Sequence, residues 1–330
     1  MAVQVPMIDA DGVSAALSYV DCIELMEDAL RTFDRGDAVQ PMRSVIQLPD
    51  GTGTLYTMPA FIAAPRSLAV KMIAVFHGND AHGLPSHQGI VVAFDPDTGS
   101  PVLLIDAARL TAIRTASVSA VATRALARAD AGVLAVLGTG VQARSHIEAI
   151  ALVRAIHEVR VWGRRPERAR ELAGLITGSA ASAGDTPAVN VVVCDSAADA
   201  VADADIICTT TSAREPVLEG AWLKPGAHIN AIGASTPDAR ELDSATIARS
   251  RVFVDSIDAA LMEPGDLLVP LGQGVTDVRG WAPIGAVLNG NAPGRRATEE
   301  ITLFKSVGLA IEDAAAAAHI ARRQPAPGEA

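Results

Sequence analysis

A glycine-rich turn is the first segment of the chain whose residue types point to chemistry. It has the pattern G-x-G-x-x-A and consists of Gly138, Thr139, Gly140, Val141, Gln142 and Ala143. Glycines permit a tight turn and let a pyrophosphate approach the N-terminus of the following helix, where unpaired N–H groups favour negative charge. A strand precedes the turn, and a helix and a second strand follow at the expected distances, so the segment predicts dinucleotide binding rather than a purely structural turn.

The second strand, EVRVWG, ends where the adenosine ribose of a dinucleotide lies. An Asp or Glu there would bind the ribose 2′-hydroxyl, but this chain has Gly163, Arg164 and Arg165. Two guanidinium groups without a carboxylate suit a 2′-phosphate. The sequence therefore favours NADPH, with NADH still possible; the alternative is that both arginines only solvate the start of the next helix.

Three basic residues can anchor an anionic substrate. Arg43 precedes a strand, Lys71 lies inside the apolar run LAVKMIAVF, and Arg114 lies in a helix whose neighbouring residues are small or apolar. A cation buried without a partner is costly, so a lysine that points inward from a strand usually meets an anion. The alternative for Lys71 is a side chain that faces water.

Histidines and cysteines give no strong indication of a metal. His77, His82 and His87 are spaced by five residues in HGNDAHGLPSHQG, which places no two of them on one helical face, and Gly, Pro and Asn predict a loop. We expect no metal site, although His87 can still lie near a ligand. The three cysteines are widely separated and fit neither a disulfide framework nor a zinc cluster.

A second turn of small residues follows the apolar run HINAIG. Gly233 and Ala234 lead to Ser235, and the next acidic residue is Asp238. A proton transfer near neutral pH needs a base such as Asp. Ser235 instead offers a hydroxyl that can hydrogen-bond a substrate nitrogen or carboxylate, and we expect Asp238 to be a helix N-cap.

The residues before the glycine turn predict an α+β domain. Residues 9–37 carry apolar residues at helical spacing and predict one amphipathic helix that ends at Gly36. The runs SVIQL, TLYTMPAFI, LAVKMIAVF, GIVVAF and PVLLID are separated by turn residues and predict a mostly antiparallel sheet. The Ala-rich segment 109–128 contains neither Pro nor Gly and predicts a long buried helix.

The pattern changes at residue 132, where continuous apolar runs alternate with helical segments. Runs such as VLAVLG, EVRVWG, VNVVV and DIICTT are apolar on both faces, which is typical of a parallel sheet with doubly wound topology. AHINAIG and RVFVDS are further strands of the series. Residues 298–323 predict a last helix that packs against the first, and residues 324–330 a frayed tail.

Composition narrows the class of partner. The formal net charge is -11 and there is no Lys/Arg-rich run, which argues against nucleic acid or an anionic membrane surface. No apolar run approaches the roughly 18 to 20 residues that span a bilayer, and the N-terminus lacks a basic region followed by an apolar core. We expect a cytoplasmic protein that acts on a small molecule.

Taken together, these segments resemble the ornithine cyclodeaminase/mu-crystallin family over nearly the whole chain. The similar stretches are GLPSHQG with the DPDTG hairpin, LTAIRTASVSAVATRALA, LGTGVQARSHIEA, VRVWGRRPERA, LKPGAHINAIGASTPDARELD and TLFKSVGLAIED. The resemblance implies a homodimer with an α/β fold, in which a Rossmann-type doubly wound domain, residues 119–303, is inserted into an α+β substrate and dimerisation domain, residues 1–118 and 304–330.

The resemblance also implies roles for individual residues. Arg43, Lys71 and Arg114 bind the substrate carboxylate, with Tyr56 and His87 beside the substrate; Lys71, Arg114 and Ser235 are the catalytic candidates. The residues expected around the cofactor are Ser86, His87, Thr115, Gly138, Thr139, Gly140, Val141, Gln142, Gly163, Arg164, Arg165, Thr209, Thr211, Gly233 and Ser306.

Two departures from the cyclodeaminase pattern favour one branch of the family. Cyclodeaminases carry a catalytic aspartate in a G-A-D-x-P-G-K type segment, where this chain has Ser235. They also place a glutamate before the L-M-P segment to meet the distal amine of the amino acid, where this chain has Tyr56. Both changes resemble the mu-crystallin and ketimine reductase branch, in which G-A-S-x-P-D is the usual form.

We therefore expect an NAD(P)H-dependent reductase of cyclic ketimine carboxylates, of the Δ1-pyrroline-2-carboxylate or Δ1-piperideine-2-carboxylate type, that yields an L-cyclic amino acid. Reduction of a preformed imine needs positioning and electrostatic stabilisation more than a general base. The alternatives, in order, are an open-chain imino acid reductase or alanine-type amino-acid dehydrogenase, an ornithine cyclodeaminase, and a binding protein that holds NADPH and a small ligand without turnover.

Overall fold

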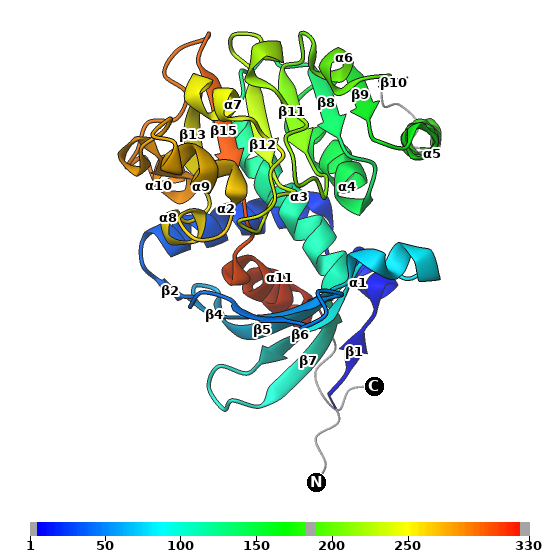
Figure 1. The fold of residues 1–330 in the computed structure, drawn as a ribbon. Coiled ribbons are helices and arrows are strands. Elements are labelled where there is room, and N and C mark those ends of the chain that lie inside the picture. The colour runs from blue at the N-terminus through cyan, green and yellow to red at the C-terminus, as the bar shows by residue number, and fades with distance from the viewer. Residues whose placement is uncertain (1–4, 183–188, 324–330) are drawn as a thin grey trace. The chain divides into compact units, whose positions relative to one another are not determined.

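The computed structural model describes residues 5–182 and 189–323, and the chain divides into two compact units. Unit 1 comprises residues 1–115 and 308–330, and unit 2 comprises residues 116–307. Figure 1 shows a largely antiparallel sheet in unit 1 and a parallel sheet in unit 2. The predicted α/β fold with a doubly wound sheet and a second α+β domain is confirmed.

The sheet of unit 1 is built from the predicted β-rich runs. Its strands are β1 (Met7–Ile8), β2 (Ala38–Val39), β3 (Ser44–Gln47), β4 (Thr54–Ala63), β5 (Arg66–Val75), β6 (His87–Phe94) and β7 (Pro101–Asp106). They follow the order β1-β7-β6-β5-β4-β2, with β3 also paired to β4. Every pair is antiparallel except β1 with β7, so the expected mostly antiparallel sheet is present.

Side chains of β4 and β5 alternate between the two faces of this sheet. Met58 and Lys71 are buried on the face against which α11 (Ala310–Arg322) packs. Ser67 lies on the same face and donates a hydrogen bond to the Ala314 carbonyl in α11. The intervening side chains on the other face are half-buried or exposed. Alanines make α11 thin enough to lie close to the strands, which brings polar atoms of helix and sheet into contact.

The N-terminal segment forms two helices, so the prediction of one continuous helix over residues 9–37 is wrong. The helices are α1 (Ala10–Ala16) and α2 (Tyr19–Asp34). Ser18 has an extended backbone and its hydroxyl accepts a hydrogen bond from the first turn of α2. Serine is a favoured N-cap because it satisfies one of the unpaired N–H groups there. Gly36 follows α2 with a φ of 80°, as expected for a glycine beyond a helix end.

The sheet of unit 2 is parallel throughout and follows the order β10-β9-β8-β11-β12-β15-β13-β14. Its strands are β8 (Val133–Leu137), β9 (Glu158–Trp162), β10 (Asn190–Val193), β11 (Ile206–Thr209), β12 (His228–Ala231), β13 (Ser250–Val254), β14 (Ala282–Pro283) and β15 (Ile301–Lys305). From β8 the chain first adds β9 and β10 on one side and then adds β11 and β12 on the other side. The glycine turn after β8 therefore lies at the switch point where doubly wound sheets bind ligands.

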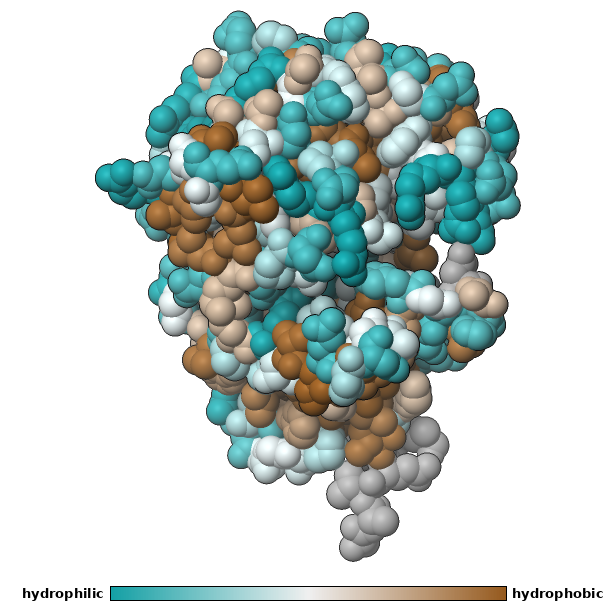
Figure 2. Space-filling view, in the orientation of Figure 1, coloured by the Kyte–Doolittle hydropathy of each residue, from teal (hydrophilic) through white to brown (hydrophobic). Residues whose placement is uncertain are grey.

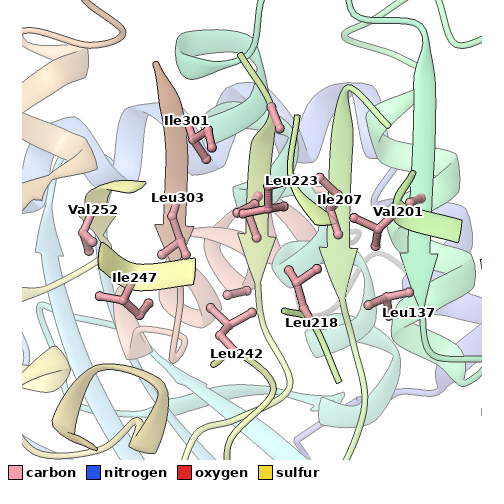
Figure 3. Packing of buried hydrophobic residues seen from close by; sticks show 14 of the residues in the cluster. Leu137, Val201, Ile207, Leu218, Leu223, Leu242, Ile247, Val252, Ile301 and Leu303 are labelled. Atoms are coloured by element: carbon pink, nitrogen blue, oxygen red, sulfur yellow. The ribbon is translucent and has the colours of Figure 1, made fainter. Parts of the chain in front are cut away.

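Helices cover the sheet of unit 2 and close its core. They are α4 (Val141–Ile150), α5 (Pro166–Ser182), α6 (Ala197–Val201), α7 (Ser244–Arg249), α8 (Ile257–Ala260), α9 (Gly265–Gly272) and α10 (Ile284–Leu288), with 3-10 turns at His77–His82 in unit 1 and at Gly220–Trp222 and Val278–Gly280 in unit 2. Figure 3 shows Leu137, Ile207 and Leu303 projecting from strands β8, β11 and β15 into one buried cluster. Burial of this cluster holds the strand ends that carry the candidate cofactor residues.

The C-terminal segment also differs from its prediction, because residues 298–323 do not form one helix. Ile301–Lys305 is β15, which pairs with both β12 and β13, and α11 starts only after Gly308, whose φ is 80°. A short buried apolar run has the same pattern in a strand as in a helix, so the sequence did not distinguish them. The proposed domain boundary before residue 304 would cut this strand. The tail expected to fray, residues 324–330, lies outside the described residues.

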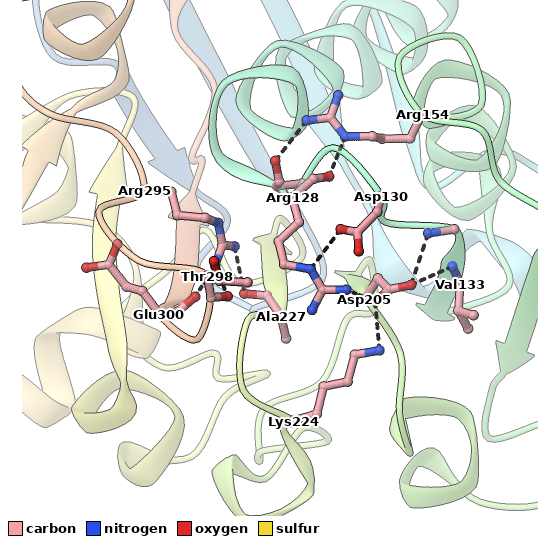
Figure 4. A network of polar contacts seen from close by, with 12 residues as sticks. Arg128, Asp130, Val133, Arg154, Asp205, Lys224, Ala227, Arg295, Thr298 and Glu300 are labelled. Atoms are coloured by element: carbon pink, nitrogen blue, oxygen red, sulfur yellow. Dashed lines mark hydrogen bonds and ion pairs between the residues drawn. The ribbon is translucent and has the colours of Figure 1, made fainter.

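The long helix predicted over residues 109–128 is α3 (Ala107–Leu126), and arginines hold its C-terminal end. Arg154 donates hydrogen bonds to the carbonyls of Thr123, Arg124, Ala127 and Arg128. Arg295 donates to the carbonyl of Leu126. Figure 4 shows the neighbouring network, in which the Asp205 carboxylate accepts from the backbone of Val133 and pairs with Arg128 and Lys224. The last carbonyls of a helix have no intrahelical partner, so cations stabilise this end.

Hydrophobic side chains on the face shown in Figure 2 form separate patches between hydrophilic ones. Within the part of the chain that the structure describes, no helix combines the length and the apolar character needed to cross a membrane.

Candidate active site

The glycine turn of unit 2 has the geometry of an anion site. Gly138 has a φ of 130°, and a Cβ there would lie 2.5 Å from Thr210 Oγ1 and 2.8 Å from Thr210 O. Only glycine fits such a position. Gly140 is the N-cap of α4 and supplies no side-chain cap, and both Gly140 and Val141 are exposed. The first N–H groups of α4 are therefore open to a phosphate, and the residues present fit a dinucleotide.

The end of β9 lies beside this turn. A Cβ on Gly163 would come within 2.6 Å of Thr139 Cγ2, so the two segments are in close contact. Arg164 and Arg165 follow, exposed, between β9 and α5. The two guanidinium groups thus belong to the segment that contacts the turn.

A buried glutamate, absent from the predicted site, joins three of the predicted cofactor residues. Glu241 Oε2 accepts from Thr209 Oγ1 and from Gly233 N, both at 2.7 Å. Its Oε1 accepts from the N–H and the hydroxyl of Thr211 at 2.5 and 2.8 Å. Burial and the nearby Asp266 raise the pKa of Glu241. Glu241 holds the loops after β11 and β12 together, and its partners are too distant in sequence for any local pattern to identify it.

Two more buried acids continue this network. Asp266 Oδ1 accepts from the backbone N–H groups of Glu241 and Leu242, and its Oδ2 pairs with Lys305 Nζ at 3.0 Å. Asp255 Oδ2 accepts from Ser306 Oγ at 3.0 Å, which fixes the hydroxyl predicted to face the cofactor. We call Glu241, Asp255, Asp266 and Lys305 the acidic cluster of unit 2.

The predicted substrate cations come together in unit 1. Lys71 Nζ lies 2.7 Å from Asp313 Oδ2, and Arg114 contacts Asp313 Oδ1 through Nε at 3.2 Å and Glu312 Oε2 through Nη1 at 2.6 Å. Arg43 Nη2 donates to the Gly308 carbonyl at 2.7 Å. Lys71 is 2% exposed, so the alternative that it faces water is wrong. We call Arg43, Lys71, Arg114, Glu312 and Asp313 the cationic cluster.

The two acids of the cationic cluster were missing from the predicted site. Glu312 and Asp313 lie in the first turn of α11, where the helix dipole favours negative charge. Burial and the neighbouring Arg114 lower the pKa of Lys71 to about 8, and Asp313 opposes this shift. Arg114 keeps its charge throughout the physiological range. The sequence did indicate that a lysine buried in a strand needs an anionic partner, but it did not identify that partner as Asp313.

Apolar residues flank Lys71 on the sheet. Met58 of β4 and Val91 of β6 are its direct cross-strand partners. Tyr56 lies two positions before Met58, on the same face, and is half-buried. Thr111 Oγ1 lies 3.5 Å from Lys71 Nζ. Neither cross-strand partner of Lys71 is acidic. These two positions of the sheet therefore offer no carboxylate to pair with the distal amine of a diamino acid.

His87 begins β6 and is close enough to influence the cationic cluster. Its Nδ1 lies 2.9 Å from Ser86 Oγ, and its ring meets that of His77 edge-on at 6.3 Å between centroids. Desolvation, His77 and Lys71, in that order, lower the pKa of His87. Thr115, also predicted near the cofactor, is buried in α3. Among the described residues, no group of three or more His, Cys, Asp or Glu has an arrangement that could hold a metal ion.

Ser235 lies after β12 with its side chain half-buried, and its hydroxyl makes no hydrogen bond to another described residue. Asp238 is exposed, accepts from Thr236 Oγ1 and pairs with Arg214. It caps no helix, so that prediction is wrong; Asp243 is the N-cap, of α7. The hydroxyl of Ser235 is thus open to a ligand, while Asp238 is held in a surface pair.

Comparison with known proteins identifies the family. A sequence model of the ornithine cyclodeaminase/mu-crystallin family matches residues 4–326. The ketimine reductase mu-crystallin of Mus musculus is 41% identical over 295 residues, which covers 88% of each chain. The chain belongs to the ornithine cyclodeaminase/mu-crystallin family. The resemblance inferred from the sequence motifs is confirmed.

Two solved structures similar to this family member cover almost its whole length. The Delta(1)-pyrroline-2-carboxylate reductase of Thermococcus litoralis, in complex with NADH and L-proline, has a TM-score of 0.92 and 35% identity and covers 96% of both chains. An archaeal alanine dehydrogenase dimer with bound NAD has a TM-score of 0.88 and 30% identity, covering 97% of this chain and 96% of the other. Both relatives bind a nicotinamide dinucleotide.

Proposed function

We propose that this chain is an NADPH-dependent reductase of cyclic ketimine carboxylates, of the Δ1-pyrroline-2-carboxylate or Δ1-piperideine-2-carboxylate type, that produces an L-cyclic amino acid. The observation that carries the proposal is the cationic cluster, in which Lys71 and Arg114 are buried and share Asp313. The relative from Thermococcus litoralis supports it, since that protein binds NADH and the cyclic amino acid L-proline.

The cationic cluster binds and orients the substrate in this proposal. Arg43, Arg114 and Lys71 bind the carboxylate, and Tyr56 and His87 lie beside the ring. Reduced nicotinamide, when bound, supplies a hydride to the imine carbon. Lys71 is mostly protonated near neutral pH, because its pKa is about 8, and it donates a proton to the imine nitrogen. Ser235 donates or accepts a hydrogen bond at that nitrogen or at the carboxylate.

The cofactor residues divide between the two units. In unit 2 the glycine turn, residues 138–142, binds the pyrophosphate, and Arg164 and Arg165 bind a 2′-phosphate, so we propose NADPH as the preferred cofactor. Loops at the strand ends contribute Thr209, Thr211, Gly233 and Ser306, and unit 1 contributes Ser86, His87 and Thr115. Support for NADPH comes from the two exposed arginines; the relatives described above bind NADH or NAD.

We also propose a homodimer that forms through the sheet of unit 1. The face opposite α11 carries apolar side chains; at its centre Val70 lies between Pro59 and Val92. The archaeal alanine dehydrogenase relative is a dimer. Val70→Asp should convert a dimer to a monomer in light scattering, because a charge buried at an interface is costly. Asp97→Ser, on an exposed hairpin, is the control; a dimeric Val70→Asp variant would contradict this interface.

A cytoplasmic location is proposed from the cysteines. Cys22, Cys194 and Cys208 are all free thiols, and Cys22 and Cys208 are buried. Free thiols are typical of reducing compartments.

One assay tests the function and its alternatives. The purified protein is incubated with NADPH and either cyclic ketimine carboxylate, or with NADPH and pyruvate plus methylamine, and the absorbance of the reduced cofactor is followed. A third sample contains L-ornithine and NAD⁺, and release of ammonia is measured there, because cyclodeamination leaves no net change in the cofactor. We expect rapid oxidation of NADPH with the cyclic imines and no reaction with ornithine. The similarity to alanine dehydrogenase makes the open-chain substrate the second candidate, and preferential turnover of pyruvate plus methylamine would select it. Turnover of ornithine would make the enzyme a cyclodeaminase instead.

A further inference from the structure

Asp313 joins the two buried cations that the proposed reaction uses. Its Oδ2 lies 2.7 Å from Lys71 Nζ and its Oδ1 lies 3.2 Å from Arg114 Nε. The Asp313 side chain is 1% exposed, and that of Lys71 2%. Within the described residues, the carboxylate paired with Lys71 is that of Asp313. One side chain thus sets the distance between an ammonium and a guanidinium from different elements.

The neighbouring acid, Glu312, shares the partner Arg114 but not Lys71. Glu312 Oε2 lies 2.6 Å from Arg114 Nη1, and the structure gives no ion pair between Glu312 and Lys71. Both acids stand in the first turn of α11 and both are buried. They therefore share helix position, charge and contact with Arg114, and differ in the contact with Lys71.

We propose that Asp313 is a positioning residue, which fixes the Lys71 ammonium and the Arg114 guanidinium in the geometry needed to bind the carboxylate and protonate the imine nitrogen of one substrate. The inference rests on the proposed imine reductase function. In the reaction the imine carbon receives the hydride of NADPH and the nitrogen receives a proton from Lys71 Nζ. The C=N double bond becomes a C–N single bond, the cofactor is oxidised, and the neutral lysine then takes a proton from water.

The charges around Lys71 give the direction of its response to pH. Asp313 and Glu312 approach from α11, Arg114 from α3, Arg43 from the segment before β3, and His87 from β6 with His77 behind it. Burial, Arg114 and Arg43 lower the pKa of Lys71, whereas Asp313 raises it. Loss of the Asp313 charge therefore lowers this pKa further, so that Lys71 loses its proton at a lower pH.

Asp313→Asn and Glu312→Gln form the matched pair that tests this role. Each replaces a carboxylate by its amide in the same turn of α11. For Asp313→Asn we expect kcat with the cyclic imine to fall about 10-fold or more at pH 8, with the alkaline limb of the kcat/KM profile moved to lower pH. Glu312→Gln should raise KM for the imine and leave the alkaline limb in place. Equal pH profiles for the two variants would overturn the inference.

A second comparison separates positioning from loss of structure. In a Lys71→Met background the proposed proton donor is absent, so Asp313→Asn should change the residual kcat by less than about 2-fold, and its remaining contact with Arg114 should affect only KM. In Asp313→Asn alone the buried Lys71 ammonium loses its carboxylate partner. The double variant does not contain this ammonium, so it can still be measured if Asp313→Asn alone does not fold. An equal fall in kcat with and without Lys71 would show that Asp313 acts independently of it. If the wild-type enzyme reduced no cyclic imine, the proposed function itself would be wrong; a normal wild type with two equal amide variants would contradict only the role of Asp313.

Discussion

The two units bury charged clusters of opposite balance. The cationic cluster of unit 1 sets three cations against two carboxylates, while the acidic cluster of unit 2 sets three carboxylates against Lys305. In unit 2 the surplus negative charge is met by the protein itself, through backbone N–H groups such as Gly233 N and through threonine and serine hydroxyls. In unit 1 the surplus is positive, which suits an anionic ligand.

The acidic cluster is therefore satisfied by contacts within the protein, whereas the cationic cluster has the charge expected of the proposed substrate site. A carboxylate such as Glu241, with donors on both oxygens, has no capacity left for a substrate, and its effect is to fix the loops that carry Thr209, Thr211 and Gly233. The buried Lys71 and Arg114 are different, because a bound substrate carboxylate would stabilise their positive charges. We expect damage to the first cluster to appear in stability and damage to the second to appear in catalysis.

Loss of the lysine in unit 1 should have the largest effect. Lys71→Met removes the proposed proton donor, and we expect kcat with the cyclic imine to fall by about 10²- to 10⁴-fold. Asp313 keeps Arg114 as a partner in this variant, so the fold should persist. Steady-state kinetics with circular dichroism of the same sample checks both expectations; a kcat within about 3-fold of wild type would remove Lys71 from the chemistry.

Loss of the lysine in unit 2, Lys305, should reduce stability rather than catalysis. Lys305→Met leaves Asp266 buried without its cation, which we expect to lower the free energy of unfolding by about 3 to 5 kcal/mol. All three tryptophans, Trp162, Trp222 and Trp281, lie in unit 2, so their fluorescence during urea unfolding follows this unit. An unchanged urea midpoint combined with a large loss of kcat would erase the distinction between the clusters.

The units should also respond to opposite ends of the pH scale. Burial lowers the pKa of His146 to about 4, and burial with the charge of Arg295 lowers that of His228 to about 3. In the unfolded chain a histidine has a pKa near 6.5, so below this pH it binds a proton that the buried histidines of folded unit 2 do not bind. The free energy of unfolding therefore decreases as the pH falls below about 6.5. Between pH 7 and 5 we expect a loss of about 2 kcal/mol for each histidine.

His228→Gln tests this pH dependence. It should remove about half of the acid-induced loss seen by tryptophan fluorescence, while His82→Gln, an exposed control in unit 1, should leave it unchanged. Equal acid sensitivity of wild type and His228→Gln would mean that carboxylates of the acidic cluster control it instead. Unit 1, in contrast, should lose activity on the alkaline side, as Lys71 deprotonates with a pKa of about 8.

The smallest expected effect concerns the two arginines proposed to bind a 2′-phosphate, which lie outside both clusters. Arg164→Ser/Arg165→Ser removes charge-assisted contacts, and we expect kcat/KM for NADPH to fall about 10- to 100-fold while that for NADH stays nearly constant. Arg170→Ser, exposed further along α5, serves as the control. If the double variant still preferred NADPH, these arginines would not be the 2′-phosphate site.

The sequence predicted features that depend on local pattern. The glycine turn after β8, the alternation of β5 and the inward direction of Lys71 all follow from residue types within a few positions of one another. The same holds for α3, whose composition contains no helix breaker. Where pattern is ambiguous the prediction was wrong: the five residues of β15 have the same apolar character in a strand and in a helix.

Contacts between distant segments were beyond the sequence. Asp313 meets Lys71 only because α11 packs on the sheet of unit 1, and Glu241 meets Thr209 only after β11 and the loop beyond β12 come together. Nothing in the residues around Glu241 or Asp313 distinguishes them from surface acids. The sequence predicted the cations because burying a single charged side chain is costly wherever its partner lies. The identity of the partner depends on how the elements pack, which the sequence pattern does not contain.

The split of unit 1 across the chain has a consequence for biosynthesis. The lysine and the two arginines of the cationic cluster are made early, but Glu312 and Asp313 emerge from the ribosome only after the whole of unit 2. Until then Lys71 and Arg114 lack these counter-ions, and no α11 covers the inner face of the unit 1 sheet. The proposed substrate site is therefore the last part of unit 1 to be completed during synthesis, and a nascent chain that stalls before α11 lacks two of the charged residues of the cationic cluster.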